Sequence, residues 1–67
     1  MEIKYYKIYR WEAYGYEEYN WYYQTLALAE EVVKDWEEDW LINEVEIVFY
    51  DDGLVGVFEE TVLEKGE

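Results

Sequence analysis

Carboxylates are the most abundant side chains in this 67-residue chain that could do chemistry. The chain carries 18 acidic residues against five basic ones, a formal net charge of −13. The acidic residues are densest between positions 30 and 39, where six of them stand with a single lysine. A carboxylate can act as a general acid or base, bind a metal cation, or pair with a basic partner. The other residues of the sequence decide among these three roles.

Catalysis is disfavoured by the side chains that the chain lacks. There is no Ser, Cys or His, so a nucleophilic triad would have neither its usual nucleophile nor an imidazole base. The two aliphatic hydroxyls, Thr25 and Thr61, stand at the ends of predicted elements. Paired carboxylates can cleave glycosides, but so short a chain has little room for a substrate cleft. We therefore predict that the protein is not an enzyme.

Metal and cofactor sites are also weakly indicated. The run Asp51-Asp52-Gly53, followed by Glu59 and Glu60, lacks the spacing of a calcium-binding EF-hand loop. The chain has no cysteine to hold zinc, and its four glycines are too scattered for a phosphate-binding loop. The sequence predicts neither a metal site nor a cofactor.

The negative charge is unevenly distributed. Residues 1–11 hold one acidic and three basic residues, whereas residues 12–67 hold 17 acidic and two basic residues. Such a field repels nucleic acids and anionic membranes and favours a basic protein as the partner. The alternative interpretation is that the acidity only keeps a small, aromatic-rich protein soluble.

Hydrophobic periodicity predicts a single α+β domain over residues 1–67. A period of two in β-prone residues predicts strands: 2–14, 19–25, 44–50 and 54–60. Residues 14–18 are predicted as a loop, and an alternative for 19–25 begins a helix with Asn20 as its N-cap. The elements predict hairpin, helix, hairpin: an antiparallel sheet of about four strands with one helix packed on one face.

The second hairpin has the strongest turn signal. Asp51-Asp52-Gly53 separates two β-rich segments, and Gly53 can adopt the positive φ that a tight turn needs. A two-residue loop would pair Phe49 with Gly56, whereas a three-residue loop with a bulge would pair Phe49 with Val55. The tail is expected to fray after Leu63.

Residues 25–40 predict the helix, with Thr25 as its N-cap and 41–43 as its end. Apolar residues recur at helical spacing along one face, which we expect to be buried against the sheet: Leu26, Ala29, Val32, Val33, Trp36 and Trp40. The acidic residues fall outside this face, at one net charge per ~2.7 Å of helix axis, against one per ~1.7 Å in duplex DNA. Because like charges four residues apart destabilise a helix, this crowding hints at a function.

In size, acidity and lack of a catalytic inventory, the chain resembles the small phage-encoded inhibitors of host defence, which include anti-CRISPR and anti-restriction DNA mimics. The resemblance rests on composition over the whole chain. It implies an inhibitor that acts in the host-cell cytoplasm and blocks target-DNA binding by a CRISPR effector or another nucleic-acid-binding enzyme. A cytoplasmic location also agrees with the lack of a visible signal peptide or membrane span.

The acidic residues expected to bind such a partner form one predicted surface: Glu30, Glu31, Asp35, Glu37, Glu38, Asp39, Glu17, Glu18, Asp51 and Asp52. An alternative is a homodimer or an accessory interaction module that docks through an aromatic face of its sheet, with Tyr6 or Tyr22 in the contact. Ten of the 15 aromatic residues lie in the first half of the chain, more than one small helix can cover. A carbohydrate-stacking platform is a third interpretation.

Overall fold

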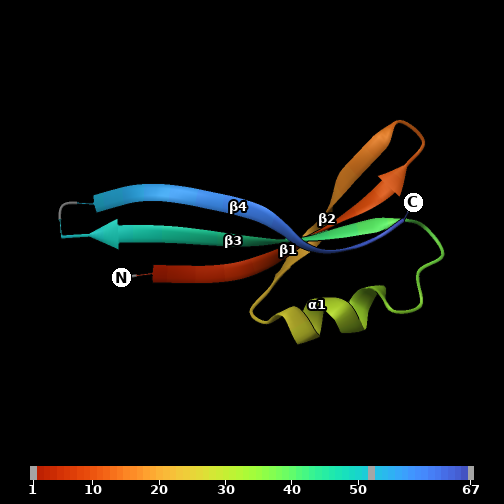
Figure 1. The fold of residues 1–67 in the computed structure, drawn as a ribbon, viewed down its shortest axis with the longest axis horizontal. Coiled ribbons are helices and arrows are strands. Elements are labelled where there is room, and N and C mark those ends of the chain that lie inside the picture. Colours follow the sequence, from red (N-terminus) through yellow and green to blue (C-terminus); the bar gives the residue numbers. More distant parts are fainter. Residues whose placement is uncertain (1, 52, 67) are drawn as a thin grey trace.

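The chain folds into an antiparallel sheet with one short helix against one of its faces (Figure 1). A computed structural model describes residues 2–51 and 53–66, apart from the side chain of Asn20. The elements, in chain order, are β1 (Glu2–Glu12), β2 (Gly15–Tyr23), α1 (Leu26–Val33), β3 (Trp40–Tyr50) and β4 (Gly53–Lys65). The predicted α+β class, with an antiparallel sheet and a single helix, is confirmed.

The strands lie in the order β2-β1-β3-β4, so the central pair is β1 with β3. Their register runs from Glu2 opposite Val48 to Arg10 opposite Trp40. The N–H of Trp11 donates to the carbonyl oxygen of Asp39 at 2.8 Å and continues this ladder by one pair. In an antiparallel ladder, residue pairs that exchange backbone hydrogen bonds (bonded pairs) alternate with pairs that do not (unbonded pairs). The odd-numbered residues of β1 therefore bond to β3, and the even-numbered residues present their N–H and C=O groups to the opposite edge.

The core lies between α1 and the face of the sheet that carries Ile8 of β1. Its buried members come from the helix and the two central strands: Ile8, Ala29, Val33, Trp40 and Ile42. Tyr19, Tyr23 and Leu26 are among the partly buried side chains that pack around them. A helix of only eight residues has a short apolar face that cannot cover the core by itself, so aromatic rings of β1 and β2 cover the rest of the core.

The helix is half as long as predicted. Thr25 caps it as expected, because its side-chain oxygen accepts a hydrogen bond from the N–H of Leu28 at 3.2 Å. It ends at Val33, however, and residues 34–39 form a loop before β3 begins at Trp40. Acidic residues repel one another and the negative end of a helix dipole, which disfavours continuation here. Lys65 stabilises the loop by donating to the carbonyl oxygens of Trp36 and Glu37 at 2.7 and 3.1 Å.

The strands β1 and β2 end at Glu12 and Tyr23, each two residues short of the prediction, and three other segments are strand where none was predicted. Strand β2 begins at Gly15, so the loop predicted at 14–18 is wrong beyond Tyr14, and residues 20–23 are strand rather than the start of a helix. Residues 41–43, predicted to end the helix, lie inside β3. Strand β4 continues through Leu63 to Lys65. In each of these three segments, pairing with a neighbouring strand extends an element beyond its local β signal.

Neither predicted register of the second hairpin is correct. Tyr50 pairs with Gly53 and Phe49 with Leu54, after which Val48 pairs with Gly56. Val55 is therefore the extra residue of a β-bulge on β4. Gly53 has φ of +125°, the positive value that the turn was expected to need. Asp52 lies outside the described residues.

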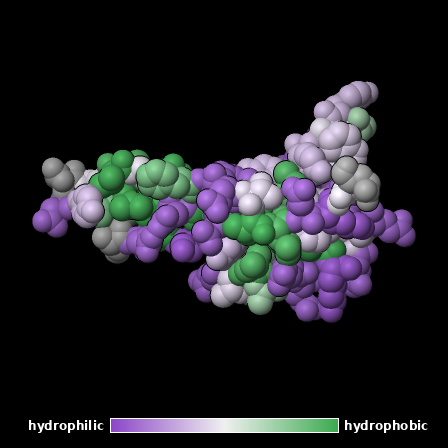
Figure 2. Space-filling model, viewed as in Figure 1, coloured by the Kyte–Doolittle hydropathy of each residue, from purple (hydrophilic) through white to green (hydrophobic). Residues whose placement is uncertain are grey.

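Strands β1, β3 and β4 extend beyond the helix as a three-stranded arm (Figure 1). We define the arm by its residue ranges: 2–5, 46–50 and 53–58. It gives the molecule a longest dimension of 44 Å. Many of its large apolar side chains are exposed: Ile3, Tyr50, Leu54, Val55, Val57 and Phe58. Figure 2 shows hydrophobic side chains on the arm and, separately, above the helix, with hydrophilic side chains between them.

Candidate partner-binding surfaces

The acidic helix face predicted from the sequence does not form. Glu30 and Glu31 are exposed on α1, but the other four acidic residues of that face lie in the loop after it: Asp35, Glu37, Glu38 and Asp39. The predicted charge density, close to that of the phosphates in DNA, required one continuous helix through residue 39. Because the helix ends at Val33, that prediction is wrong. Lys34 ion-pairs with Glu31, and the half-buried Asp39 is held through its backbone by Trp11.

The remaining predicted binding residues lie elsewhere on the molecule. Glu17 and Glu18 are exposed on β2, and Glu17 is in register with Arg10. Asp51 is exposed in the turn after β3, at the end of the arm, and the prediction for Asp52 falls outside the described residues. Figure 1 places this turn and the loop between α1 and β3 at opposite ends of the long axis. The structure therefore does not bring the predicted acidic residues together as one surface.

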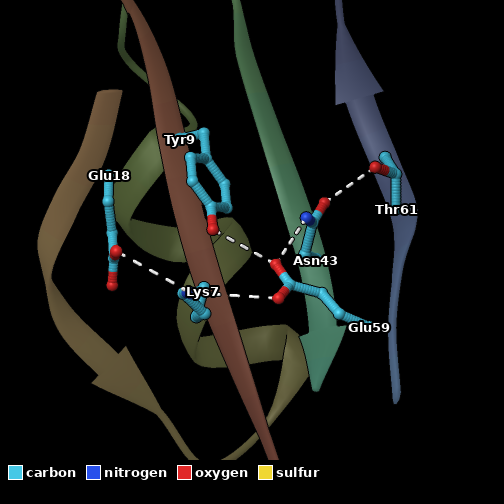
Figure 3. Close-up of polar contacts among 6 residues, drawn as sticks. All are labelled: Lys7, Tyr9, Glu18, Asn43, Glu59 and Thr61. Atoms are coloured by element: carbon cyan, nitrogen blue, oxygen red, sulfur yellow. Dashed lines mark hydrogen bonds and ion pairs between the residues drawn. The ribbon is translucent and has the colours of Figure 1, made fainter. Parts of the chain in front are cut away.

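A polar cluster occupies the sheet face opposite the helix (Figure 3). Lys7 of β1 lies between two carboxylates from the outer strands, with its Nζ 3.7 Å from Glu18 Oε1 and 3.9 Å from Glu59 Oε1. Glu59 Oε2 also accepts hydrogen bonds from Tyr9 at 3.2 Å and from Asn43 at 2.8 Å. The cluster thereby connects both edges of the sheet through its two central strands.

The charge state of Lys7 follows from these neighbours. Its interaction with the Tyr9 hydroxyl raises the pKa of Lys7, burial opposes this, and the carboxylates of Glu59 and Glu18 raise it further. The Glu18 carboxylate also raises the pKa of Tyr22. Lys7 is therefore protonated at neutral pH and acts as a structural cation, which is the wrong state for a general base. Lys7 is not among the residues predicted to bind a partner, although in the sequence it is the charged residue that interrupts the apolar alternation of this strand.

Two aromatic pairs flank the polar cluster on the same face. Tyr5 and Tyr22 have ring centroids 5.0 Å apart, and Trp11 meets Tyr16 edge-on at 5.1 Å. Trp11, Tyr16 and Tyr22 are exposed. An aromatic sheet face does exist, and Tyr22 belongs to it. Tyr6 lies on the opposite face instead, where its hydroxyl donates to Glu44 Oε2 at 2.9 Å.

An acidic groove runs over β3 and β4. It has a volume of about 370 Å³ and is lined by residues of both strands: Glu44, Glu46, Val57, Phe58, Glu59 and Glu60. Glu44 is directly opposite Glu60 in the register, and like charges in that position destabilise a sheet. Glu44 bonds to Tyr6 and lies 4.0 Å from Lys4. Among the described residues, Glu46 and Glu60 make no ion pair or side-chain hydrogen bond with one another or with any neighbour.

Glu44 and Glu46 are not among the residues that the sequence predicted to bind a partner. Their even spacing in Glu44-Val45-Glu46-Ile47 indicates one shared face of a strand. Their position beside Phe58 and Glu60 depends on the bulged register with β4, which short-range patterns did not predict.

A second, smaller groove of about 220 Å³ contains two of the predicted residues, Glu17 and Glu18. Arg10 also lines it and pairs with Glu12 through Nε at 2.7 Å, which raises the pKa of Arg10. The Arg10 guanidinium lies 5.2 Å from the ring centre of Trp36. Arg10 is itself part of the lining of this groove, whereas the described lining of the acidic groove over β3 and β4 contains no basic residue, so the second groove is a weaker candidate for a basic ligand.

Comparison with models of known protein families, with curated proteins and with solved structures finds no match to this chain. Within residues 2–51 and 53–66, no three carboxylates are grouped so that they could hold a metal ion. The helix that these residues form is too short to cross a membrane.

Proposed function

We propose that this chain is a non-enzymatic acidic inhibitor that binds a basic, nucleic-acid-binding surface of a partner protein. The acidic groove carries the proposal. It combines a concavity of about 370 Å³ with the opposed carboxylates of Glu44 and Glu60. A lysine or arginine placed between two such carboxylates relieves their repulsion, so binding recovers the stability that the free protein gives up.

The groove suits a guanidinium better than a small inorganic cation. Phe58 is exposed on its wall, and an aromatic ring attracts a cation placed over its face. Glu46 is directly opposite Phe58 in the register, so a carboxylate and a ring are presented side by side. Arginine pairs with carboxylates in a planar fork and stacks on aromatic rings.

A nucleic-acid-binding groove is the partner surface that fits this chemistry. Such surfaces carry closely spaced arginine and lysine side chains that bind phosphates. The exposed acidic residues outside the groove would supply long-range attraction, because the chain carries −13 in total. In this proposal the chain acts as a nucleic-acid mimic, in the manner of an anti-CRISPR protein, and blocks target-DNA binding by a CRISPR effector or a similar enzyme.

Binding to purified CRISPR effectors and restriction enzymes, at low and high salt, tests the proposal. Glu46→Gln/Glu60→Gln should weaken binding by about tenfold or more, because a hydrogen bond to a charged group contributes ~1.5–3 kcal/mol and ~1.4 kcal/mol is a factor of ten in affinity. Glu30→Gln/Glu31→Gln removes the same charge from the helix and should weaken binding no more than a few-fold. Equal losses of affinity in the two variants would show that the partner is attracted by net charge alone and not by the groove. Binding that does not respond to salt would reject the mimic.

The aromatic face supports a second candidate function, an interaction module in which acidity serves only solubility. Exposed tyrosine and tryptophan are enriched in protein interfaces, and Trp11 and Tyr22 are exposed on the same face. Under this function, Trp11→Ser or Tyr22→Ser should abolish partner binding, whereas Glu46→Gln/Glu60→Gln should not. Tyr14→Ser is the matched control, because Tyr14 is fully exposed in the turn between β1 and β2.

A further inference from the structure

The outer edge of β1 is open along the arm. Strand β2 pairs with β1 from Tyr6 onward, with Tyr6 opposite Tyr23. Over residues 2–5, no other strand among the described residues lies against this edge, while β3 occupies the other edge. A sheet edge with free N–H and C=O groups is a template for pairing with another chain.

The alternation of the ladder identifies the groups that are free. Trp11 bonds to Asp39 in the ladder with β3, so the odd-numbered residues of β1 face β3. Glu2 and Lys4 therefore direct their backbone N–H and C=O groups away from the sheet. Only residues whose backbone N–H and C=O groups point outward can bond to an added strand. If that strand is the same segment of another copy, an even-numbered residue must therefore oppose an even-numbered residue.

We propose that the partner at this edge is a second copy of the same chain. Its residues 2–5 lie antiparallel to those of the first copy, with a two-fold axis beside Ile3. Glu2 of each copy then opposes Lys4 of the other, and these two pairs exchange four backbone hydrogen bonds. Their side chains form two opposite-charge pairs on one face of the continuous sheet.

Charge selects this register over the other two that the alternation allows. A shift in one direction places Glu2 opposite Glu2 of the second copy, and like charges in that position repel. A shift in the other direction places Lys4 opposite Lys4 and Glu2 opposite Tyr6, whose outer edge is already paired with β2. The register centred on Ile3 is therefore the one that pairs opposite charges and also leaves each outward backbone group with a free partner.

The apolar side chains support the same arrangement. Ile3, Ile47 and Val57 form one row across β1, β3 and β4. Because Ile3 meets Ile3 of the second copy in an unbonded pair, where side chains approach most closely, the two rows join into one. Ile3 is 41% exposed in the single chain and would become covered by its counterpart.

The position of the contact limits the long-range repulsion between two acidic chains. Residues 1–11 carry more basic than acidic side chains, so the contact forms at the least acidic part of the chain. The arm projects away from the helix (Figure 1), and antiparallel pairing of two arms leaves the two helices at opposite ends. The acidic groove over β3 and β4 stays open, so association and partner binding can be tested separately.

Charge exchange at Glu2 and Lys4 tests the dimer, with sedimentation measured over a concentration series. Glu2→Lys and Lys4→Glu should each weaken self-association by about tenfold or more, because both cross-strand pairs become repulsive. An equimolar mixture of these two variants should form a heterodimer. The double variant Glu2→Lys/Lys4→Glu should associate as the unmodified chain does.

Two controls make the result decisive. Glu64→Lys, on β4, makes the same change in net charge as Glu2→Lys, from −13 to −11, and should not weaken association. Lys4→Pro removes an outward N–H without removing a bond to β3 and should abolish the dimer. A monomeric unmodified chain at every concentration, or stronger association of Glu2→Lys than of the unmodified chain, would overturn the proposal.

Discussion

Lys7 should stabilise the folded chain more than Lys4, Lys34 or Lys65. Its side chain is 16% exposed and bridges Glu18 and Glu59, which come from the two outer strands. Lys7→Met keeps most of the aliphatic stem and removes only the ammonium group. Each exposed ion pair contributes ~0.2–1 kcal/mol, so losing two such pairs should lower the free energy of unfolding by ~0.4–2 kcal/mol. A chain of this length has roughly 3–10 kcal/mol in total, so the loss is large.

Lys4→Met is the matched control for this change. Lys4 is 45% exposed and has a single carboxylate, that of Glu44, at 4.0 Å. Its removal should cost less than about 0.5 kcal/mol. Urea unfolding followed by tryptophan fluorescence, with dilute protein at pH 7, measures both variants.

Two outcomes would refute this reasoning about Lys7. The first is an equal loss in the free energy of unfolding of the two variants. That result would mean that the half-buried, bridging Lys7 stabilises the fold no more than the exposed Lys4 does. The second is a Lys7→Met chain that is at least as stable as the unmodified one. That result would mean that the cost of desolvating Lys7 offsets its two ion pairs.

Three further predictions concern the core, a tyrosine and the hairpin. Ile8→Ala should lower the free energy of unfolding by about 2–5 kcal/mol in urea titrations, because Ile8 is fully buried, whereas Ile3→Ala on the exposed arm should cost under ~1 kcal/mol. The hydrogen bond to Glu44 raises the pKa of Tyr6 above 10.0, so the stability it contributes is present below pH 10 and lost as pH rises further. Tyr6→Phe should therefore be less stable than the unmodified chain at pH 9, with a smaller difference at pH 11, in denaturant titrations at the two pH values. Gly53→Ala should cost about 1 kcal/mol or more in thermal unfolding, because φ of +125° strains a residue with a Cβ.

Local patterns were sufficient to predict the class of fold. Alternation along β1 and within residues 44–50 indicated strands, and Thr25 before Leu26 indicated where the helix begins. Gly53 indicated a tight turn. These signals depend on neighbouring residues in the chain, whose preferences are similar in many tertiary settings.

The end of the helix could not be predicted in the same way. Trp36 and Trp40 continue the helical spacing of Val32 and Val33, but Trp40 and Ile42 also fit a strand with a period of two. Pairing with β1 resolves this ambiguity, because Trp40 and Ile42 then bury their side chains against Ile8. Trp36 remains in the loop, half-buried against Tyr19 and Arg10.

The candidate sites depended most on tertiary structure. The sequence by itself determined the net charge, the lack of histidine and cysteine, and the abundance of aromatic residues. Only the order and register of the strands placed Glu44 opposite Glu60 and brought Lys7 between Glu18 and Glu59. Composition determines how much charge a chain carries. The pairing of distant strands determines which charges meet, because residues that are far apart in sequence become neighbours only across a sheet.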